Sequence, residues 1–386
     1  MNIIFLNWAC FCAPDTCDAL RNLGHKVKVM QISDDAHVMI DEKFIRELSD
    51  SIKEFHCELV FSLNFFPSVS IACQEAGCRY VSWIYDCPQV KVYDKTAAHD
   101  CNRIFTFDSH MAEQLNNRGV NTVTYAPLAA NVKRLTAQTI TSAQRNKYNC
   151  DVSFVGHLYN EDHNFYERLL EKAQSPYLEG YLDGIIQAQK HIFGYNLLSD
   201  CLTPEITATI RQHMPFSIPE GAYLREEEVY ADYYLARRLA TIDRTELLYC
   251  LAEFFDVSLY TSSDTTIGKV KNRGKVHYYD EMPTLFRISK INLNISLRSI
   301  KNGIPLRAMD ILGCGGFLMS NFQSDFLRHF EPEVHFTAYS SVPEAVDKCN
   351  YYLTHEEERQ RIASNALELM KKEHTYEVRL QEMLSC

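Results

Sequence analysis

The sequence lacks the features that mark several large classes of proteins. No window holds the ~18 uninterrupted apolar residues of a membrane-spanning helix. Gly and Pro contribute only 14 and 12 of the 386 residues, which excludes collagen-like and low-complexity chains. Positive charge is also scarce, because 39 Lys and Arg stand against 50 Asp and Glu, for a net charge of −11. Nucleic acid is therefore not an expected partner.

Several catalytic and targeting signals are missing as well. The chain has no HExxH, P-loop or GxSxG motif, and no GxGxxG follows its first apolar run, which argues against dinucleotide binding by the N-terminal part. The start, MNIIFLNWACFCA, has no preceding basic residue and reads as a strand rather than a signal peptide, so we expect a cytoplasmic protein. The 14 cysteines lack zinc-site spacing, which predicts reduced thiols and no metal site.

What is present is a regular alternation of strand and helix patterns. The length predicts two or three domains. Over residues 1–135, six short apolar runs alternate with helical patterns, three of which stop at Gly24, Gly77 and Gly119. Such strand–helix–strand units predict right-handed crossovers and a parallel sheet covered on both faces.

A second block of the same kind follows a polar stretch at 136–147. Over residues 148–355, the predicted strands are CDVSFVGH, DVSLYT, KVHYYD, INLNIS, GGFLMS and HFTAY, and a helical insertion interrupts them at about 160–245. The predicted fold class is therefore α/β, with two doubly wound Rossmann-like domains that face a cleft where parallel strands end. The insertion could cover an acceptor or form a homodimer contact.

Residues 291–321 carry the most chemistry. An apolar strand leads into a loop ending at Asn302 and Gly303, and a helix starts after Ile304 at Pro305, whose fixed φ suits a first turn. The unpaired amides of that turn suit a diphosphate. Arg307 can add donors to phosphate oxygens, and Asp310, on the same helix face, could take the hydroxyls of a ribose.

These segments resemble a known family. The runs KINLNIS and GIPLRAMDILGCGGFLMSNF look like the C-terminal signature of CgeB-type spore-maturation proteins, which are two-Rossmann-domain (GT-B) glycosyltransferases. DVSFVGHLYNE and WIYDCP…RIFTFDS are similar to that family's other marks. The ending, 356–386, looks like the closing helices of this fold, the last of which returns to the first domain. The resemblance implies a hexosyltransferase-like enzyme with a nucleotide-sugar donor and no metal or other cofactor.

The resemblance also assigns roles by position. Asp310 matches the second acidic residue of the E-x7-E motif of related retaining enzymes, which binds the nucleotide ribose, whereas Asn302 stands at the first. Arg307 matches a basic residue that faces the diphosphate. Gly156 matches the glycine that lets the donor approach the backbone.

Four further assignments leave alternatives open. Asp86, after the run VSWIY, could be a general base, bind the acceptor, or form a turn before Pro88. His157 could lie in the cleft or be structural, and Tyr278 could stack on a nucleobase or pack at a strand end. Asp310 could instead be an exposed helix carboxylate or pair with Arg307.

The sequence thus predicts a metal-independent, retaining glycosyltransferase that moves a sugar from a nucleotide-diphosphate donor to a hydroxyl of a glycan, protein or small molecule. Two alternatives are a nucleotide-sugar epimerase of the same fold and a non-catalytic two-domain ligand-binding or scaffold protein.

Overall fold

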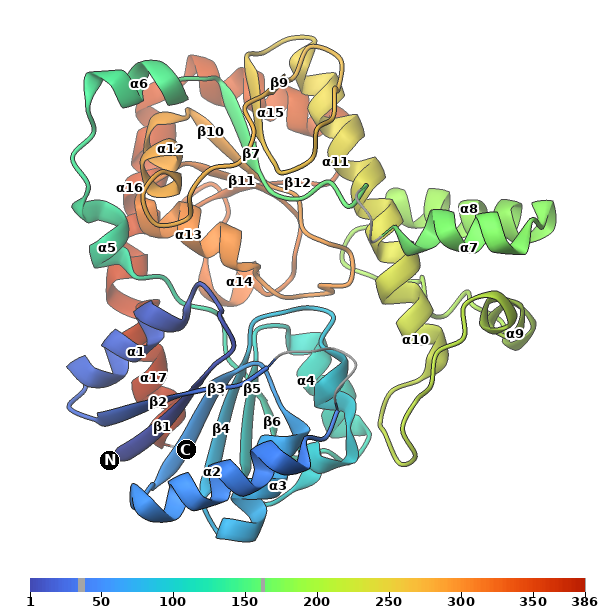
Figure 1. Cartoon of the computed structure of the whole chain (residues 1–386). Coiled ribbons are helices and arrows are strands. Elements are labelled where there is room, and N and C mark those ends of the chain that lie inside the picture. The colour runs from blue at the N-terminus through green and yellow to red at the C-terminus, as the bar shows by residue number, and fades with distance from the viewer. Residues whose placement is uncertain (34–38, 161–163, 386) are drawn as a thin grey trace. The chain divides into compact units, whose positions relative to one another are not determined.

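The computed structural model describes residues 1–33, 39–160 and 164–385, and the chain divides into two compact units. The first unit comprises residues 1–129, 218–224 and 373–386, and the second comprises 130–217 and 225–372. Each unit is built around a six-stranded parallel sheet with flanking helices (Figure 1). The predicted class, two doubly wound α/β domains with a helical insertion in the second, is confirmed.

The first sheet has the strand order β2-β1-β3-β4-β5-β6. Its strands are β1 (Asn2–Asn7), β2 (Lys26–Gln31), β3 (Leu59–Leu63), β4 (Arg79–Ile84), β5 (Asn102–Thr106) and β6 (Val123–Tyr125). Helix α1 (Ala13–Asn22) packs on the C-terminal helix α17 (Tyr376–Ser385), and α2 (Glu42–Glu54) packs on α3 (Pro67–Ala76) (Figure 1). The remaining helices of this sheet are η1 (Val90–Tyr93), η2 (Lys95–Ala98) and α4 (Ser109–Asn117).

Glycines stop three helices of the first unit, as the sequence predicts. Gly24, Gly77 and Gly119 follow α1, α3 and α4 with φ values of 84°, 63° and 90°. This left-handed region is strained for residues that carry a Cβ, so glycine is the residue that ends these helices at low cost.

The second sheet has the strand order β12-β11-β10-β7-β8-β9. Its strands are β7 (Val152–Val155), β8 (Val257–Tyr260), β9 (Lys271–Asn272), β10 (Ile291–Asn294), β11 (Leu318–Asn321) and β12 (Thr337–Tyr339). The helices packed around it are α5 (Val132–Ala137), α6 (Ser142–Tyr148), α11 (Ala236–Ala252), α12 (Met282–Ile288), α13 (Leu306–Cys314), α14 (Phe326–His329), α15 (Val342–Thr354) and α16 (Glu356–Glu373).

One predicted strand is wrong. The run KVHYYD (275–280) forms no strand, and the edge position next to β8 is taken by Lys271 and Asn272. The Glu281 carboxylate accepts the backbone N–H of His277 at 2.9 Å, and the His277 ring accepts that of Asp280 at 3.3 Å. These local bonds offer the backbone an alternative to a sheet ladder, so the segment becomes a turn.

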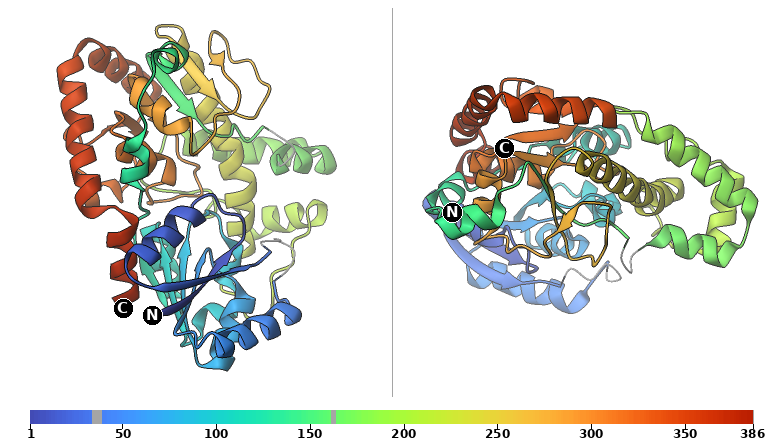
Figure 2. Two further views of the ribbon diagram at one scale, coloured as in Figure 1. Left: turned by 60° about the vertical axis from the view of Figure 1, so that its left-hand side comes forward. Right: turned by 90° about the horizontal axis from the view of Figure 1, so that it is seen from above.

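The helical insertion has a core of its own. It contains α7 (Phe165–Ala173), α8 (Pro176–Lys190), α9 (Pro204–His213) and α10 (Glu226–Tyr230), and a π-helical turn at Ala231–Leu235 joins α10 to α11. In Figure 2 the green helices α7 and α8 lie to one side of the second sheet. Buried side chains from all of these helices meet, namely Tyr166, Leu182, Ile206, Tyr230 and Leu239. Among the described residues, no helix combines the length and apolar character needed to cross a bilayer.

Gly316, between α13 and β11, lies in close contact with neighbouring residues of the second unit. A Cβ on Gly316 would come within 2.7 Å of the Phe286 carbonyl oxygen and 2.9 Å of Asn292 Nδ2. Because backbone cannot move aside easily, we expect Gly316→Ala to lower the free energy of unfolding by about 1–3 kcal/mol in urea denaturation.

The matched control is Gly184→Ala in α8, where an added Cβ meets nothing within 4 Å. This substitution should raise the free energy of unfolding by about 0.5–1 kcal/mol, since alanine loses less backbone entropy than glycine in a helix. Equal effects of the two substitutions would contradict this account.

Candidate functional site

The strand order of the second sheet reverses between β7 and β10. The connections from β7 to β8 and from β10 to β11 run in opposite directions, so the loops that follow β7 and β10 separate at this point. In open α/β sheets, ligands bind outside the carboxyl ends of strands at such a switch point. The predicted residues Gly156 and His157 follow β7, and Asn302, Gly303, Ile304 and Pro305 lie in the loop that follows β10.

A buried arginine from α11 joins these two loops. Arg244, only 6% exposed, donates from Nε and Nη2 to the Ile295 carbonyl oxygen at 3.2 and 2.6 Å, and from Nη1 to the carbonyl oxygen of His157. Its guanidinium also lies over the Tyr159 ring, 4.7 Å from the centroid. The sequence prediction missed Arg244, because an arginine within the charged run LARRLATIDR carries no sign that it is buried.

The loop after β10 is held along its length. The Arg298 Nε donates to Asp243 Oδ2 at 2.7 Å in a nearly buried ion pair, and the Ser296 amide donates to Asn321 Oδ1 at 2.8 Å. Further along, the Asn302 carbonyl oxygen accepts the Asp325 amide at 3.1 Å. These contacts fix the backbone that leads into α13, which is what a binding site built on a loop requires.

Pro305 is the N-cap of α13, one position earlier than the first-turn place that its sequence suggested. Its φ and ψ are −69° and 153°, and its carbonyl oxygen accepts the Ala308 amide at 3.0 Å. The helix then runs to Cys314 and ends at Gly315, whose φ is 76°. The amides of Leu306 and Arg307 precede the first helical hydrogen bond, so they carry the partial positive charge of a helix start.

Arg307, Asp310 and Tyr278 come together beside this helix start. The Arg307 guanidinium lies 3.6 Å from Asp310 Oδ2, and the Tyr278 hydroxyl donates to Asp310 Oδ1 at 3.1 Å. Asp310 is 2% exposed, so of the roles the sequence left open the structure shows the pair with Arg307 and not an exposed carboxylate. Arg307 and Tyr278 thus face the two carboxylate oxygens of Asp310.

Two aromatic rings and a second arginine lie near the start of α13. Arg134, from α5, lies over the rings of Tyr278 and Tyr279, 5.3 and 4.5 Å from their centroids. The turn that carries both tyrosines is anchored by Glu281, whose carboxylate accepts from Lys147 Nζ at 2.7 Å and from the Tyr148 hydroxyl at 2.7 Å. Tyr278 is therefore in a turn and not at the end of a strand, and Arg134 is a cation that the sequence prediction missed.

The anchor of this turn should give the protein a measurable pH dependence. The hydrogen bond from Lys147, followed by those from the His277 amide and Tyr148, lowers the pKa of Glu281 from 4.5 to about 2. The carboxylate therefore stabilises the folded state above pH 4.5, and this contribution is lost as the pH falls towards 2. In urea unfolding at a series of pH values, Glu281→Gln should flatten the loss of stability over this range.

Glu357→Gln serves as the control, since Glu357 is an exposed glutamate of α16. It should leave the pH profile of unfolding parallel to that of the wild type. A Glu281→Gln profile that is also parallel to the wild type would show that the Glu281 anchor contributes nothing.

The remaining predicted residues lie at strand ends. Asp86 follows β4 in the first unit and is exposed, and its Oδ2 accepts from Asn64 Nδ2 at 2.6 Å. Asn64 Oδ1 in turn accepts the Asp86 amide at 3.1 Å, so the carboxylate is held in one orientation. In the second unit, His157 is exposed, with Nδ1 3.5 Å from Ser262 Oγ, and the Gly156 amide donates to the Tyr260 carbonyl oxygen at 3.1 Å.

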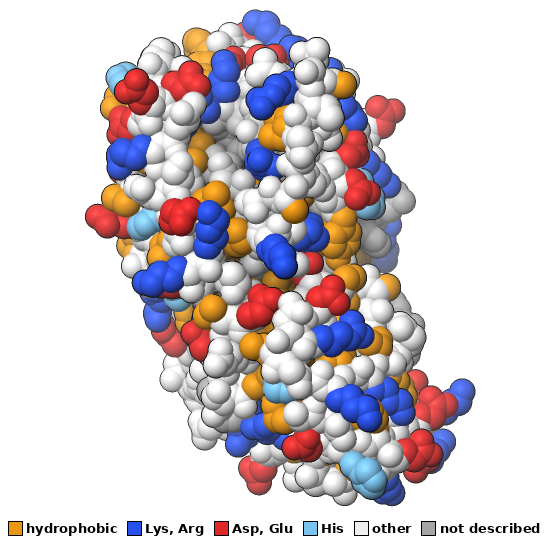
Figure 3. Space-filling model, turned by 90° about the vertical axis from the view of Figure 1, so that its left-hand side faces the viewer, with side chains coloured by type: hydrophobic (Ala, Val, Ile, Leu, Met, Phe, Trp, Pro, Cys, Tyr) orange, Lys and Arg blue, Asp and Glu red, His pale blue; other side chains and the backbone are white. Residues whose placement is uncertain are grey.

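The described residues hold no cluster of metal ligands, and one face of the molecule carries charges of both signs. Within the described parts of the chain, no three His, Cys, Asp or Glu side chains gather as they would around a metal ion. Acidic and basic side chains are interspersed over the face drawn in Figure 3. The cations of the helix start, Arg134 and Arg307, are thus a local feature of the second unit.

The bridge made by Arg244 can be tested by stability. We expect Arg244→Met, which keeps the apolar part of the side chain, to lower the free energy of unfolding by about 2–4 kcal/mol, because the buried Ile295 carbonyl oxygen and the His157 carbonyl oxygen lose their donor. Arg237→Met is the control on the same helix, since the guanidinium of Arg237 stacks on Phe165 and Tyr233. If urea denaturation shows that both variants lose the same free energy of unfolding, Arg244 does not bridge the two loops in the way described.

Comparisons with known proteins bear on the fold and the enzyme class. Residues 237–385 match the model of a family described as glycosyl transferase-like. A search of curated proteins finds no match. Among solved structures, HepE of Anabaena in complex with UDP-glucose is 11% identical with a TM-score of 0.57, covering 100% of this chain and 98% of that one. The sucrose-phosphate synthase of Thermosynechococcus elongatus is 8% identical, with the same TM-score and coverage.

A third solved structure, a glycosyltransferase from Rickettsia africae, is 10% identical with a TM-score of 0.54, covering 100% of this chain and 97% of that one. At such identities the likeness is one of fold, and the fold is the GT-B arrangement of two Rossmann-like domains. The fold and the family match together confirm the expected enzyme class, a glycosyltransferase, whereas the CgeB-type subfamily stays a prediction.

Proposed function

We propose that the chain transfers a hexosyl group from a nucleotide-diphosphate sugar to an acceptor hydroxyl. The observation that carries the proposal is the start of α13, where Arg307 and two helix-start amides follow a loop fixed at the reversal of strand order. A dianionic leaving group needs such fixed positive charge. The solved complex of HepE with UDP-glucose, a protein of the same fold, supports a nucleotide sugar as the donor.

In the proposed reaction, the bond from C1 of the sugar to the diphosphate oxygen breaks and the acceptor oxygen bonds to C1. The leaving diphosphate gains negative charge, which Arg307 and the N-terminal end of α13 stabilise. The proton of the acceptor hydroxyl passes to a base. Asp86, exposed and oriented by Asn64, is our candidate for that base or for binding the acceptor, and His157 is a second candidate.

The nucleoside half of the donor is assigned to the turn that carries Tyr278 and Tyr279. Binding of the ribose to Asp310 replaces the hydrogen bond that Tyr278 now donates. The displaced Tyr278 ring, already flanked by Arg134, then offers a surface on which a base can stack. Gly156 keeps the backbone after β7 free of a side chain, and a Cβ there would come within 3.0 Å of the Phe154 ring.

The finer parts of the assignment come from the sequence resemblance. We propose a metal-independent reaction with retention at C1, in a CgeB-type enzyme of the cytoplasm, and an acceptor that is a glycan, a protein or a small molecule. Asn302 takes the place of the first acidic residue of related retaining enzymes. A homodimer contact through the insertion remains part of the proposal, supported by the 74% and 62% exposure of Tyr177 and Tyr195.

Loss of the cation at the start of α13 should remove most of the activity. We expect Arg307→Ala to lower kcat/KM for nucleotide release from UDP-sugars about 100-fold, because the leaving diphosphate loses a charge-assisted donor. Asp310→Ala should mainly weaken binding of the donor, measured by calorimetry.

The control is Arg328→Ala on α14, whose side chain is 53% exposed. It should leave nucleotide release unchanged. Wild-type activity in Arg307→Ala would overturn the assignment, and conversion of the donor to an epimer without any acceptor would point to an epimerase instead.

A further inference from the structure

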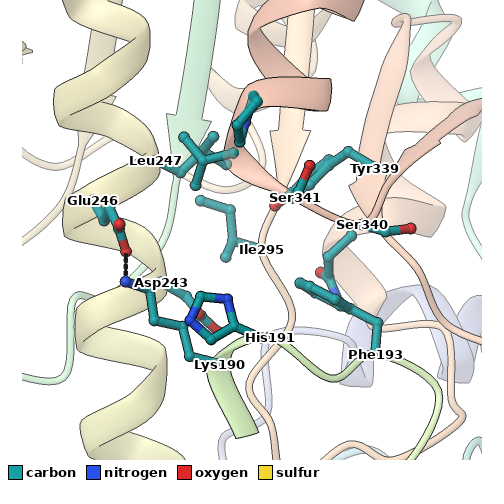
Figure 4. A pocket seen from close by; sticks show the side chains of 13 residues that line it. Lys190, His191, Phe193, Asp243, Glu246, Leu247, Ile295, Tyr339, Ser340 and Ser341 are labelled. Atoms are coloured by element: carbon teal, nitrogen blue, oxygen red, sulfur yellow. Dashed lines mark ion pairs between the residues drawn. The ribbon is translucent and has the colours of Figure 1, made fainter. Parts of the chain in front are cut away.

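A second pocket lies in the same unit, away from α13. Its volume is about 240 Å³, and its lining comes from α11, the start of α15, the ends of β10 to β12 and the loop after α8 (Figure 4). Helix α11 packs on α15, whereas α13 packs on α12 and α5. Right-handed crossovers in opposite directions put these two groups of helices on opposite faces of the sheet. None of the residues that line the pocket is among those assigned to the donor.

The walls of the pocket are mainly apolar. Leu247 and Ile295 lie side by side in Figure 4, and the ring of Phe193 stands on the opposite side with the exposed His191 near it. A cavity of 150 Å³ with apolar walls admits a benzene ring, so 240 Å³ is enough for one six-membered ring with substituents.

The charges around the pocket are balanced. Lys190 Nζ lies 2.6 Å from Glu246 Oε2, and Arg298 Nε lies 2.7 Å from Asp243 Oδ2. Each carboxylate that lines the pocket thus has a cation of its own and still has oxygens that can accept hydrogen bonds. The pocket therefore has no excess of positive or negative charge that would attract a charged ligand. This favours a neutral ligand with several hydroxyls.

A buried hydroxyl completes the polar part of the lining. Tyr339, at the end of β12, is 4% exposed, and its hydroxyl has no hydrogen-bond partner among the residues that the structure describes. Burial raises the pKa of Tyr339, and the nearby charge of Asp243 raises it further. A buried polar group without a partner is costly, and a ligand that bonds to it recovers that cost.

We propose that this pocket binds a neutral monosaccharide, either free or as one residue of a glycan. The apolar face of the sugar ring lies against Phe193, and its hydroxyls bond to Tyr339 and to the free oxygens of Asp243 and Glu246. Pockets that combine apolar walls with a few placed polar groups are the usual form of small-molecule sites. The site is additional to the donor site and does not depend on Arg307.

The test uses the full chain, saturated with UDP so that a nucleotide site is occupied. Binding of glucose, galactose, mannose and N-acetylglucosamine is measured one by one, by ligand-observed NMR at millimolar concentration. We expect at least one of them to bind, with a Kd raised about tenfold by Tyr339→Phe and binding abolished by Phe193→Ala. Tyr339→Phe removes only an unpartnered hydroxyl, so it should not lower the melting temperature.

A second buried tyrosine supplies a matched control. Tyr260, at the end of β8, is also 4% exposed, its hydroxyl also lacks a partner among the described residues, and it does not line the pocket. Tyr260→Phe should bind the sugar as the wild type does.

The outcomes separate this site from the proposed donor site. Arg307→Ala should keep the sugar and lose UDP, whereas Tyr339→Phe should keep UDP and bind the sugar weakly. The proposal fails if none of the four sugars binds the wild type, if Tyr260→Phe is impaired as much as Tyr339→Phe, or if sugar binding survives in both Tyr339→Phe and Phe193→Ala.

Discussion

The geometry of the second unit depends on one buried guanidinium. Arg244 donates to carbonyl oxygens that follow β7 and β10, the two strands between which the sheet order reverses. At such a point the backbone loses its ladder partners, and its carbonyl oxygens need other donors. A planar group with five N–H donors in a fixed fork can serve two loops at once. The position of α13 follows from that of the loop after β10.

The helical insertion and the helix that follows it therefore supply residues that hold the strand ends of the second sheet. Helix α11, which continues from the insertion, provides Asp243 and Arg244 on successive positions, the first for Arg298 and the second for the strand ends. The loop after α8 adds Phe193, which lies over the Arg298 guanidinium, 4.1 Å from its ring centroid. The same elements that fix the loop before α13 thus also form the walls of the second pocket.

The charge of the site is local and opposite to that of the whole chain. A protein with a net charge of −11 presents Arg134 and Arg307 beside the start of α13, and the nearby carboxylate of Asp310 is buried under Tyr278. The Arg307 guanidinium, 3.6 Å from Asp310 Oδ2, offsets the negative charge of this carboxylate. In the proposed reaction, a ribose that takes over the hydrogen bond between Tyr278 and Asp310 also frees the tyrosine ring.

The sequence by itself determined the local features: the alternation of strands and helices, the glycines that end α1, α3 and α4, and the helix start at Pro305. These follow from residue periodicity and backbone preferences, which neighbours along the chain decide. Tertiary structure alone decided that Arg244 is buried and that Arg134 and Glu281 support the turn that carries Tyr278 and Tyr279. Those outcomes rest on partners distant in sequence, such as Arg244 with Ile295 and Lys147 with Glu281, and no local pattern records which distant group will supply a hydrogen bond.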